Sequence, residues 1–124
     1  MSAPGDPLSG RVLLVVEDEY LVVLELAEEL ERRGATMLGP VPDVRRALRL
    51  LEGTARLDGA LLDIRLWDGL VYPVAEALRA RAIPFVFVSG FEPEFIPERF
   101  RDVPLCTKPL DLDTVAAALF GASA

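Results

Sequence analysis

The chain has 124 residues, of which 52% are hydrophobic, so it can bury the core of one domain and is too short for two ordinary ones. Its 13 Lys and Arg residues against 20 Asp and Glu residues give a formal charge of −7, which argues against nucleic-acid and anionic-membrane surfaces because both need clustered positive charge. One cysteine and no histidine exclude a disulfide framework within the chain, a Cys/His zinc site, a catalytic triad and histidine acid–base chemistry.

The first ten residues predict a flexible leader. They contain two prolines and two glycines but no basic residue, so they lack the positively charged start and the apolar centre of a signal peptide. No apolar run in the chain reaches the roughly 18 residues that span a bilayer. We therefore expect a leader over residues 1–10, a domain over 11–120, a tail over 121–124 and a cytoplasmic location.

Strands and helices alternate along the rest of the chain. Short apolar runs indicate strands covered on both faces, and apolar residues at helical spacing indicate amphipathic helices. In chain order the pattern predicts a strand over Val12–Val16, a helix over Glu19–Arg33, a strand over Ala35–Gly39, a helix over Val44–Leu51 capped by Asp43, a strand over Gly59–Leu62, a helix over Leu70–Arg81, strands over Ile83–Val88 and Val103–Thr107, and a helix over Leu112–Leu119 capped by Asp111.

This alternation predicts an α/β fold with a doubly wound, five-stranded parallel sheet. Helices are expected on both faces of the sheet, because parallel strands need crossover connections. The connection between the fourth and fifth strands differs from the others. Pro93 and Pro97 lie within it and allow one or two turns of helix at most.

Polar side chains follow four of the predicted strands. In a doubly wound sheet, functional groups gather beyond the carboxyl ends of the strands. In this chain those ends carry carboxylates, a hydroxyl and a lysine, namely Glu17, Asp18, Glu19, Asp63, Ser89 and Lys108. Each also has a purely structural interpretation, as a helix cap, a turn residue, a loop hydroxyl or a solvated charge. Together they predict a Mg²⁺ site, because carboxylates held close together repel one another unless a cation neutralises them.

Four segments at these strand ends make the sequence resemble the receiver (CheY-like) domains of two-component response regulators. In order, the segments are Val15-Val16-Glu17-Asp18-Glu19, Leu61-Leu62-Asp63-Ile64-Arg65-Leu66, Phe87-Val88-Ser89-Gly90-Phe91 and Lys108-Pro109. The resemblance covers about residues 11–120. It implies a flavodoxin-like three-layer fold of strand order 2-1-3-4-5. It also implies phosphoryl transfer from a histidine kinase to the aspartate that ends the third strand.

The resemblance assigns the acceptor and its charged neighbours. Asp63 is the expected phosphoacceptor, and Lys108 is expected to pair with Asp63 before transfer and with the phosphoryl group afterwards. Mg²⁺ is the implied cofactor, with Asp18 as a direct ligand and Glu17 acting through water. Asp63 itself and the backbone carbonyl of Arg65 are the further expected ligands. The phosphodonor must be external, because the chain contains no histidine.

The expected switch residues depart from the common receiver pattern. Ser89 is expected to meet a phosphoryl oxygen, but Leu105 replaces the aromatic residue that often lies three positions before the lysine. An aromatic residue instead follows the hydroxyl, as Phe91. This arrangement resembles a subgroup of receivers that often act with kinases of the HWE type. We expect switch or output roles for Ser89, Phe91 and Pro109, with a cis bond before Pro109.

Residues 91–100 are the predicted read-out segment. Their prolines leave few helical hydrogen bonds, and Phe91, Phe95 and Phe100 supply apolar side chains. We expect a mobile segment that becomes ordered on phosphorylation. The alternative is a static loop whose phenylalanines complete the core.

Several functions remain open from the sequence. Only residues 121–124 follow the last predicted helix, so we expect a single-domain response regulator whose output is a partner contact or the draining of phosphoryl groups from a kinase. A Mg²⁺-dependent phosphohydrolase commonly has a second aspartate two residues after the nucleophile, where this chain has Arg65. A nucleotide or flavin module would need a glycine-rich loop after the first strand, which is absent. The complete set of acids, hydroxyl and lysine disfavours a degenerate receiver that binds without phosphorylation.

Overall fold

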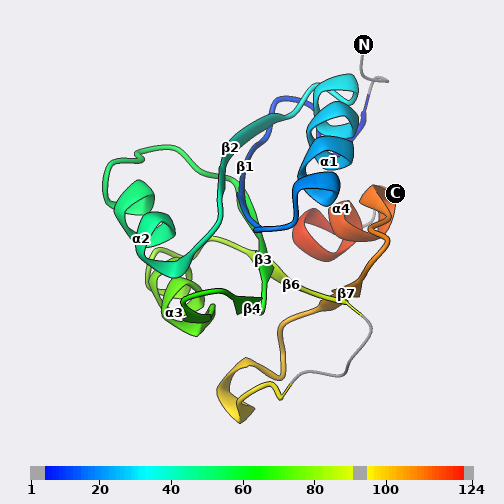
Figure 1. Ribbon diagram of the computed structural model, residues 1–124. Helices are drawn as coiled ribbons and strands as arrows, with labels where there is room; N and C mark the ends of the chain where they lie inside the picture. The colour runs from blue at the N-terminus through cyan, green and yellow to red at the C-terminus, as the bar shows by residue number, and fades with distance from the viewer. Residues whose placement is uncertain (1–4, 91–94, 122–124) are drawn as a thin grey trace.

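Five parallel strands form the predicted central sheet. The computed structural model describes residues 5–90 and 95–121. In chain order, the elements are β1 (Val12–Val16), α1 (Tyr20–Arg32), β2 (Thr36–Val41), α2 (Val44–Glu52), β3 (Gly59–Asp63), β4 (Arg65–Leu66), β5 (Gly69–Leu70), α3 (Tyr72–Ala80), β6 (Phe85–Ser89), the 3-10 turn η1 (Glu98–Phe100), β7 (Leu105–Thr107) and α4 (Leu112–Phe120). The sheet has the order β2-β1-β3-β6-β7, which is the expected 2-1-3-4-5 arrangement (Figure 1).

Helices cover both faces of this sheet, which confirms the three-layer α/β fold. α1 and α4 lie on one face, and α2 and α3 lie on the other (Figure 1). Side chains alternate along β1: Leu14 and Val16 join the core under α2 and α3. Leu13 and Val15 join the core under α1 and α4. Among the described residues, no helix is long and apolar enough to cross a membrane.

The predicted helix caps at Asp43 and Asp111 are confirmed. The Asp43 carboxylate accepts a hydrogen bond from the backbone N–H of Arg46 at 2.8 Å, so it caps α2. The Asp111 carboxylate accepts a bond from the backbone N–H of Asp113 at 3.0 Å, so it caps α4. The expected cis bond between Lys108 and Pro109 is also present, together with a second cis bond before Pro40 that the sequence did not predict.

The third helix begins later than predicted. The sequence predicted a helix from Leu70, but α3 begins at Tyr72. Residues 65–70 instead form a two-stranded hairpin, β4 and β5, in which Leu66 pairs with Gly69. Gly69 has a φ of +139°, a conformation that L side chains rarely adopt, so a glycine is needed to close this turn.

The connection between β6 and β7 is partly packed on α3. Over its described residues, 95–104, its helical content is the single turn η1, which lies within the limit of one or two turns that the prolines set. The Tyr72 hydroxyl donates a hydrogen bond to the backbone carbonyl of Phe95 at 2.5 Å. Phe100 is fully buried, whereas Phe95 is 75% exposed. Phe100 therefore completes the core, while the ordering of the segment on phosphorylation stays a prediction.

Residues 6–10 are attached to the domain, although the sequence predicted a flexible leader over residues 1–10. Leu8 is fully buried and packs in the core under α1 and α4. The Asp6 carboxylate forms an ion pair with the Arg33 guanidinium, with 3.0 Å between Oδ2 and Nε. One apolar side chain and one ion pair therefore fix this part of the chain, and a composition rich in proline and glycine did not reveal either contact.

Replacing Asp6 by asparagine is expected to lower the free energy of unfolding by about 1–2 kcal/mol. The hydrogen bond from Arg33, followed by that from the Leu8 N–H, holds the pKa of Asp6 below its ordinary value of 3.8. The stabilisation is therefore fully present above that ordinary value and is lost as the pH falls through the lowered pKa.

Urea unfolding over a series of pH values measures this effect. Asp102→Asn is the matched control, because the ion pair of Asp102 with Arg79 is exposed and is expected to contribute less than about 0.5 kcal/mol. Equal destabilisation by the two variants, or a difference that does not depend on pH, would refute a structural role for Asp6.

Candidate functional site

The residues predicted at the strand ends meet at one edge of the sheet. Asp63 is the last residue of β3 and lies beside Val88 of β6. Ser89 is the last residue of β6 and lies beside Thr107 of β7, one position before the predicted lysine. Glu17 follows directly after β1, which lies next to β3. The parallel register therefore brings the ends of four strands to the same place.

The Lys108 ammonium lies among three carboxylates. Its Nζ is 3.1 Å from Oε1 of Glu17, 3.6 Å from Oδ2 of Asp63 and 3.6 Å from Oε1 of Glu19. The Lys108 backbone N–H donates a hydrogen bond to the Ser89 carbonyl at 2.9 Å, which fixes the start of the side chain. Glu17 and Asp63 are 4% and 9% exposed, so solvent ions screen these interactions little.

Three carboxylates at this edge fit a divalent cation. Glu17, Asp18 and Asp63 each offer one oxygen, and these oxygens all lie within 4.8 Å of one another. Asp18 is exposed, whereas Glu17 and Asp63 are only 4% and 9% exposed, so the group opens to solvent at Asp18. Mg²⁺ is held by a few carboxylates with water and phosphate oxygens in its remaining positions. The donor set and its open side match that chemistry.

Burial and charge repulsion make the carboxylates of this site hard to ionise together. Burial raises the pKa of Glu17 to about 7, and the charge of Asp63 adds to the rise, while the hydrogen bond from Lys108 opposes it. Burial also raises the pKa of Asp63, and the Lys108 ammonium opposes that rise. Burial disfavours the charged form of Lys108, but its hydrogen bond to Glu17 and the charge of Asp63 outweigh this effect and raise its pKa. The lysine is therefore charged at neutral pH, and Glu17 holds a proton more readily than an exposed glutamate does.

This proton predicts that Mg²⁺ binds more tightly as the pH rises toward 7. The metal competes with the proton on Glu17, whose pKa is about 7, so affinity should rise by up to about tenfold per pH unit below that value and level off above it. Calorimetric titration with MgCl₂ between about pH 6 and pH 8 measures the slope, together with the proton released into buffers of different ionisation enthalpy. Glu17→Gln should flatten the profile. The same slope in this variant would contradict the role of Glu17.

The other predicted residues have different surroundings. Ser89 is buried, and Pro109 is exposed beyond the cis bond. The backbone N–H of Arg65 donates a hydrogen bond to the Asp63 carboxylate, which ties the hairpin to the predicted acceptor. The carbonyl of Arg65 as a metal ligand stays a prediction. Phe91 lies outside the described residues.

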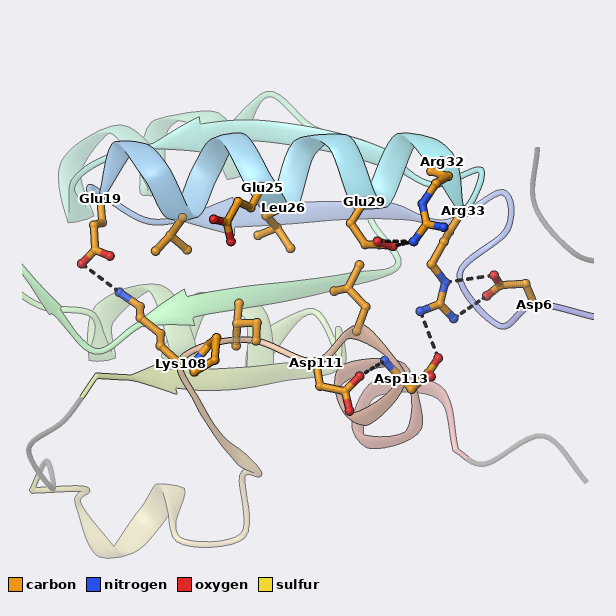
Figure 2. Close-up of a pocket in the computed structure, with 14 residues that line it drawn as sticks. Asp6, Glu19, Glu25, Leu26, Glu29, Arg32, Arg33, Lys108, Asp111 and Asp113 are labelled. Atoms are coloured by element: carbon orange, nitrogen blue, oxygen red, sulfur yellow. Dashed lines mark hydrogen bonds and ion pairs between the residues drawn. The ribbon is translucent and has the colours of Figure 1, made fainter.

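A groove adjoining the site was not identified from the sequence. It has a volume of about 830 Å³ and runs between α1 and the start of α4. Lys108 and Glu19 lie at one end of the groove, and the ion pairs of Arg33 with Asp6 and Asp113 lie at the other (Figure 2). The first turns of α1 also expose three large apolar side chains, Tyr20 at 73%, Leu21 at 69% and Leu24 at 44%. These three residues are apolar but lie outside the apolar stripe that predicted the helix. Apolar residues off that stripe were the sequence signal that could have revealed this exposed surface.

Comparisons with known proteins agree with this fold. No family model matches the chain. The chain is similar to SdrG from Sphingomonas melonis Fr1, with 42% identity and a TM-score of 0.77 over 93% of this chain and 96% of that one. It is also similar to the BeF₃-activated conformation of SdrG, from Pseudomonas melonis Fr1, with 43% identity and a TM-score of 0.71 over 89% of this chain and 93% of that one.

Two longer proteins are similar over part of their length. The response regulator PhyR from Brucella abortus shares 30% identity with a TM-score of 0.73, over 94% of this chain and 51% of that one. The transcriptional regulatory protein PdtaR from Mycobacterium tuberculosis is 28% identical over 93% of this chain. The chain spans 58% of the length of PdtaR, so the match concerns one part of that protein.

Proposed function

Because the chain belongs to the receiver domains of two-component response regulators, we propose that it accepts a phosphoryl group on Asp63 and thereby changes its binding to a partner protein. The observation that carries this proposal is the position of Asp63, a buried carboxylate beside the Lys108 ammonium and within a group of three acids. Phosphoryl transfer needs positioning and charge neutralisation more than bond-making side chains, and this site supplies both. The similar protein SdrG has a BeF₃-activated conformation, and BeF₃ mimics a phosphoryl group, which supports activation by phosphorylation.

The proposed transfer forms one bond and breaks one bond. A carboxylate oxygen of Asp63 attacks the phosphorus of a partner's phosphohistidine, and the phosphorus–nitrogen bond breaks with its electron pair returning to the imidazole. Lys108, already 3.6 Å from Oδ2 of Asp63, holds an oxygen of the incoming group. Glu17, Asp18 and Asp63 would hold Mg²⁺, which supplies neutralising charge for the phosphoryl oxygens when bound.

Acetyl phosphate labelling tests this function without knowledge of the kinase. The protein is incubated with acetyl phosphate in MgCl₂ or in EDTA, and its intact mass is measured. One phosphoryl group should be added in MgCl₂ and little in EDTA. A folded protein whose mass stays unchanged in MgCl₂, or is raised equally in EDTA, would refute the proposal.

The phosphodonor is proposed to dock along α1. Tyr20, Leu21 and Leu24 form an exposed apolar strip at the end of α1 nearest the site. The groove of Figure 2 continues from Lys108 beside this helix, so a helical partner lying on α1 can reach Asp63. The proposed partner is a histidine kinase or histidine phosphotransfer protein, and the sequence pattern of Phe85, Phe87 and Phe91 around Ser89 favours a kinase of the HWE type. We place the reaction in the cytoplasm, where such kinases present their phosphohistidine.

Ser89 and Lys108 are proposed to act at different stages. Ser89→Ala should be labelled by acetyl phosphate within about threefold of the wild-type rate, because the hydroxyl forms no bond to phosphorus, but its conformational response should be blunted. Lys108→Ala should still bind Mg²⁺, but it lacks the positive charge that pairs with the phosphoryl group after transfer, so its conformational response should also be weak. Amide NMR spectra with and without beryllofluoride measure the response of each variant. Wild-type shifts in Ser89→Ala would assign the switch to another residue.

A further inference from the structure

A second candidate interaction surface lies on the opposite side of the sheet from the groove of Figure 2. It consists of Arg45, Arg46 and Arg49 on α2 with Trp67 at the tip of the β4–β5 hairpin, and we refer to these four residues as the arginine–tryptophan face. They line a hollow of about 520 Å³ together with Asp43 and Asp68. α2 covers one face of the sheet and α1 covers the other, so both surfaces can be occupied at once (Figure 1).

The arginines of this face carry positive charge that the protein leaves largely unneutralised. Arg46 forms an ion pair with Asp43 at 3.5 Å and is still 68% exposed. Within residues 5–90 and 95–121, neither Arg45 nor Arg49 has a carboxylate at ion-pair distance.

The two aspartates in the hollow are engaged with the backbone of α2. Asp43 accepts a hydrogen bond from the N–H of Arg46. Asp68 accepts bonds from the N–H of Val44 at 3.0 Å and from that of Arg45 at 3.4 Å. These bonds join the hairpin tip to the first turn of α2, so the arginines and the tryptophan are parts of one connected structure.

Trp67 is an exposed aromatic side chain on a turn that is anchored to the core. It is 75% exposed, although its neighbour Leu66 is 4% exposed and fixes the hairpin in the core. The backbone N–H of Val71 also bonds to the Ile64 carbonyl at 2.9 Å, which closes the base of the hairpin. A tryptophan that is 75% exposed on a fixed turn contributes little to the core, and tryptophan and arginine are among the residues enriched at interaction hot spots.

From this combination we propose that the arginine–tryptophan face binds an acidic segment of a partner protein. Carboxylates of the segment would pair with Arg45 and Arg49, since guanidinium groups bind carboxylates in a bidentate manner. An apolar side chain of the segment would pack on Trp67. The hollow of about 520 Å³ offers only two arginines without an ion pair among the described residues, which suits a short acidic peptide, whereas a polynucleotide needs a longer run of positive charge. The inference does not depend on phosphoryl transfer at Asp63.

Trp67 provides its own probe, because the chain contains one tryptophan. The full chain is titrated with a synthetic peptide of repeating Glu-Glu-Leu, and a peptide of repeating Lys-Lys-Leu serves as the charge-reversed control. The acidic peptide should produce a saturable change in Trp67 fluorescence that weakens as salt is added, whereas the basic peptide should produce none. No change with the acidic peptide, or an equal change with both, would overturn the proposal.

Charge-reversal variants locate the binding. Arg45→Glu combined with Arg49→Glu should weaken peptide binding by at least about tenfold. Both positions are exposed, and the favourable carboxylate at position 45 in the first turn of α2 offsets the unfavourable one at position 49 in its last turn, so the variant should fold. Arg101→Glu is the matched control, because Arg101 is exposed and lies outside the hollow. Equal weakening by the control would overturn the assignment, as would tighter binding of single-stranded oligothymidylate than of the acidic peptide.

Discussion

Asp63→Asn is expected to lower the rate of phosphoryl uptake from acetyl phosphate or phosphohistidine by at least about two orders of magnitude. The amide is a poor nucleophile, and Asp63 is the carboxylate that ends β3, with its Oδ2 3.6 Å from the Lys108 ammonium. The variant should keep its fold. Burial raises the pKa of Asp63, so its ionised form costs stability at neutral pH and the neutral amide removes that cost.

Asp18→Asn is the matched control for this variant. Asp18 belongs to the same acidic group but is exposed and has no ion pair with Lys108 among the described residues. Its replacement should chiefly weaken Mg²⁺ binding, so labelling should recover as the MgCl₂ concentration rises. Intact-mass time courses at several MgCl₂ concentrations separate the two variants. Labelling of Asp63→Asn at the wild-type rate would identify another acceptor.

Phe100→Ala is expected to lower the free energy of unfolding by about 3–5 kcal/mol, the largest effect on stability among these predictions. The Phe100 ring is fully buried and stacks on Tyr72 with centroids 5.6 Å apart. It also meets the edges of Phe87 at 5.8 Å and Phe85 at 6.3 Å. Replacing the ring by a methyl group leaves a cavity among these aromatic side chains and removes their favourable contacts.

Phe95→Ala tests whether this effect belongs to burial or to the segment as a whole. Phe95 lies five residues earlier on the same connection but is 75% exposed, so its replacement should change stability by less than about 0.5 kcal/mol. Urea unfolding of both variants measures the contrast. Similar losses in the two variants would contradict the structure of this connection. A small loss in Phe100→Ala would indicate that the ring is free to leave the core.

The sequence predicted the centre of the sheet well because β1, β3 and β6 are buried on both faces. Val12–Val16 is a continuous apolar run, and β1 has those bounds. The strand order followed from the resemblance, and the structure confirms it. The pattern was weaker where local turn geometry decides the structure. Leu70 fits a helical stripe, but the positive φ of Gly69 closes a hairpin there, and a single residue type cannot reveal that pairing.

The candidate site was predictable because it depends on strand ends, whereas contacts between distant loops were not. The proximity of Glu17, Asp63 and Lys108 follows from the parallel order of the strands that precede them. Leu8 is buried beside an ion pair between Asp6 and Arg33, which lie 27 residues apart in the sequence. No local sequence pattern encodes a contact over that separation. The arginine–tryptophan face likewise arises only when the β4–β5 hairpin meets α2.

Locating the phosphoryl group on the chain tests the central proposal most directly. The protein is labelled with acetyl phosphate in MgCl₂ and treated with borohydride, which reduces an aspartyl phosphate to homoserine, and its peptides are then sequenced by mass spectrometry. The account predicts homoserine at position 63 and at no other aspartate. Homoserine at Asp18 instead, or a labelled protein with unmodified Asp63, would contradict it.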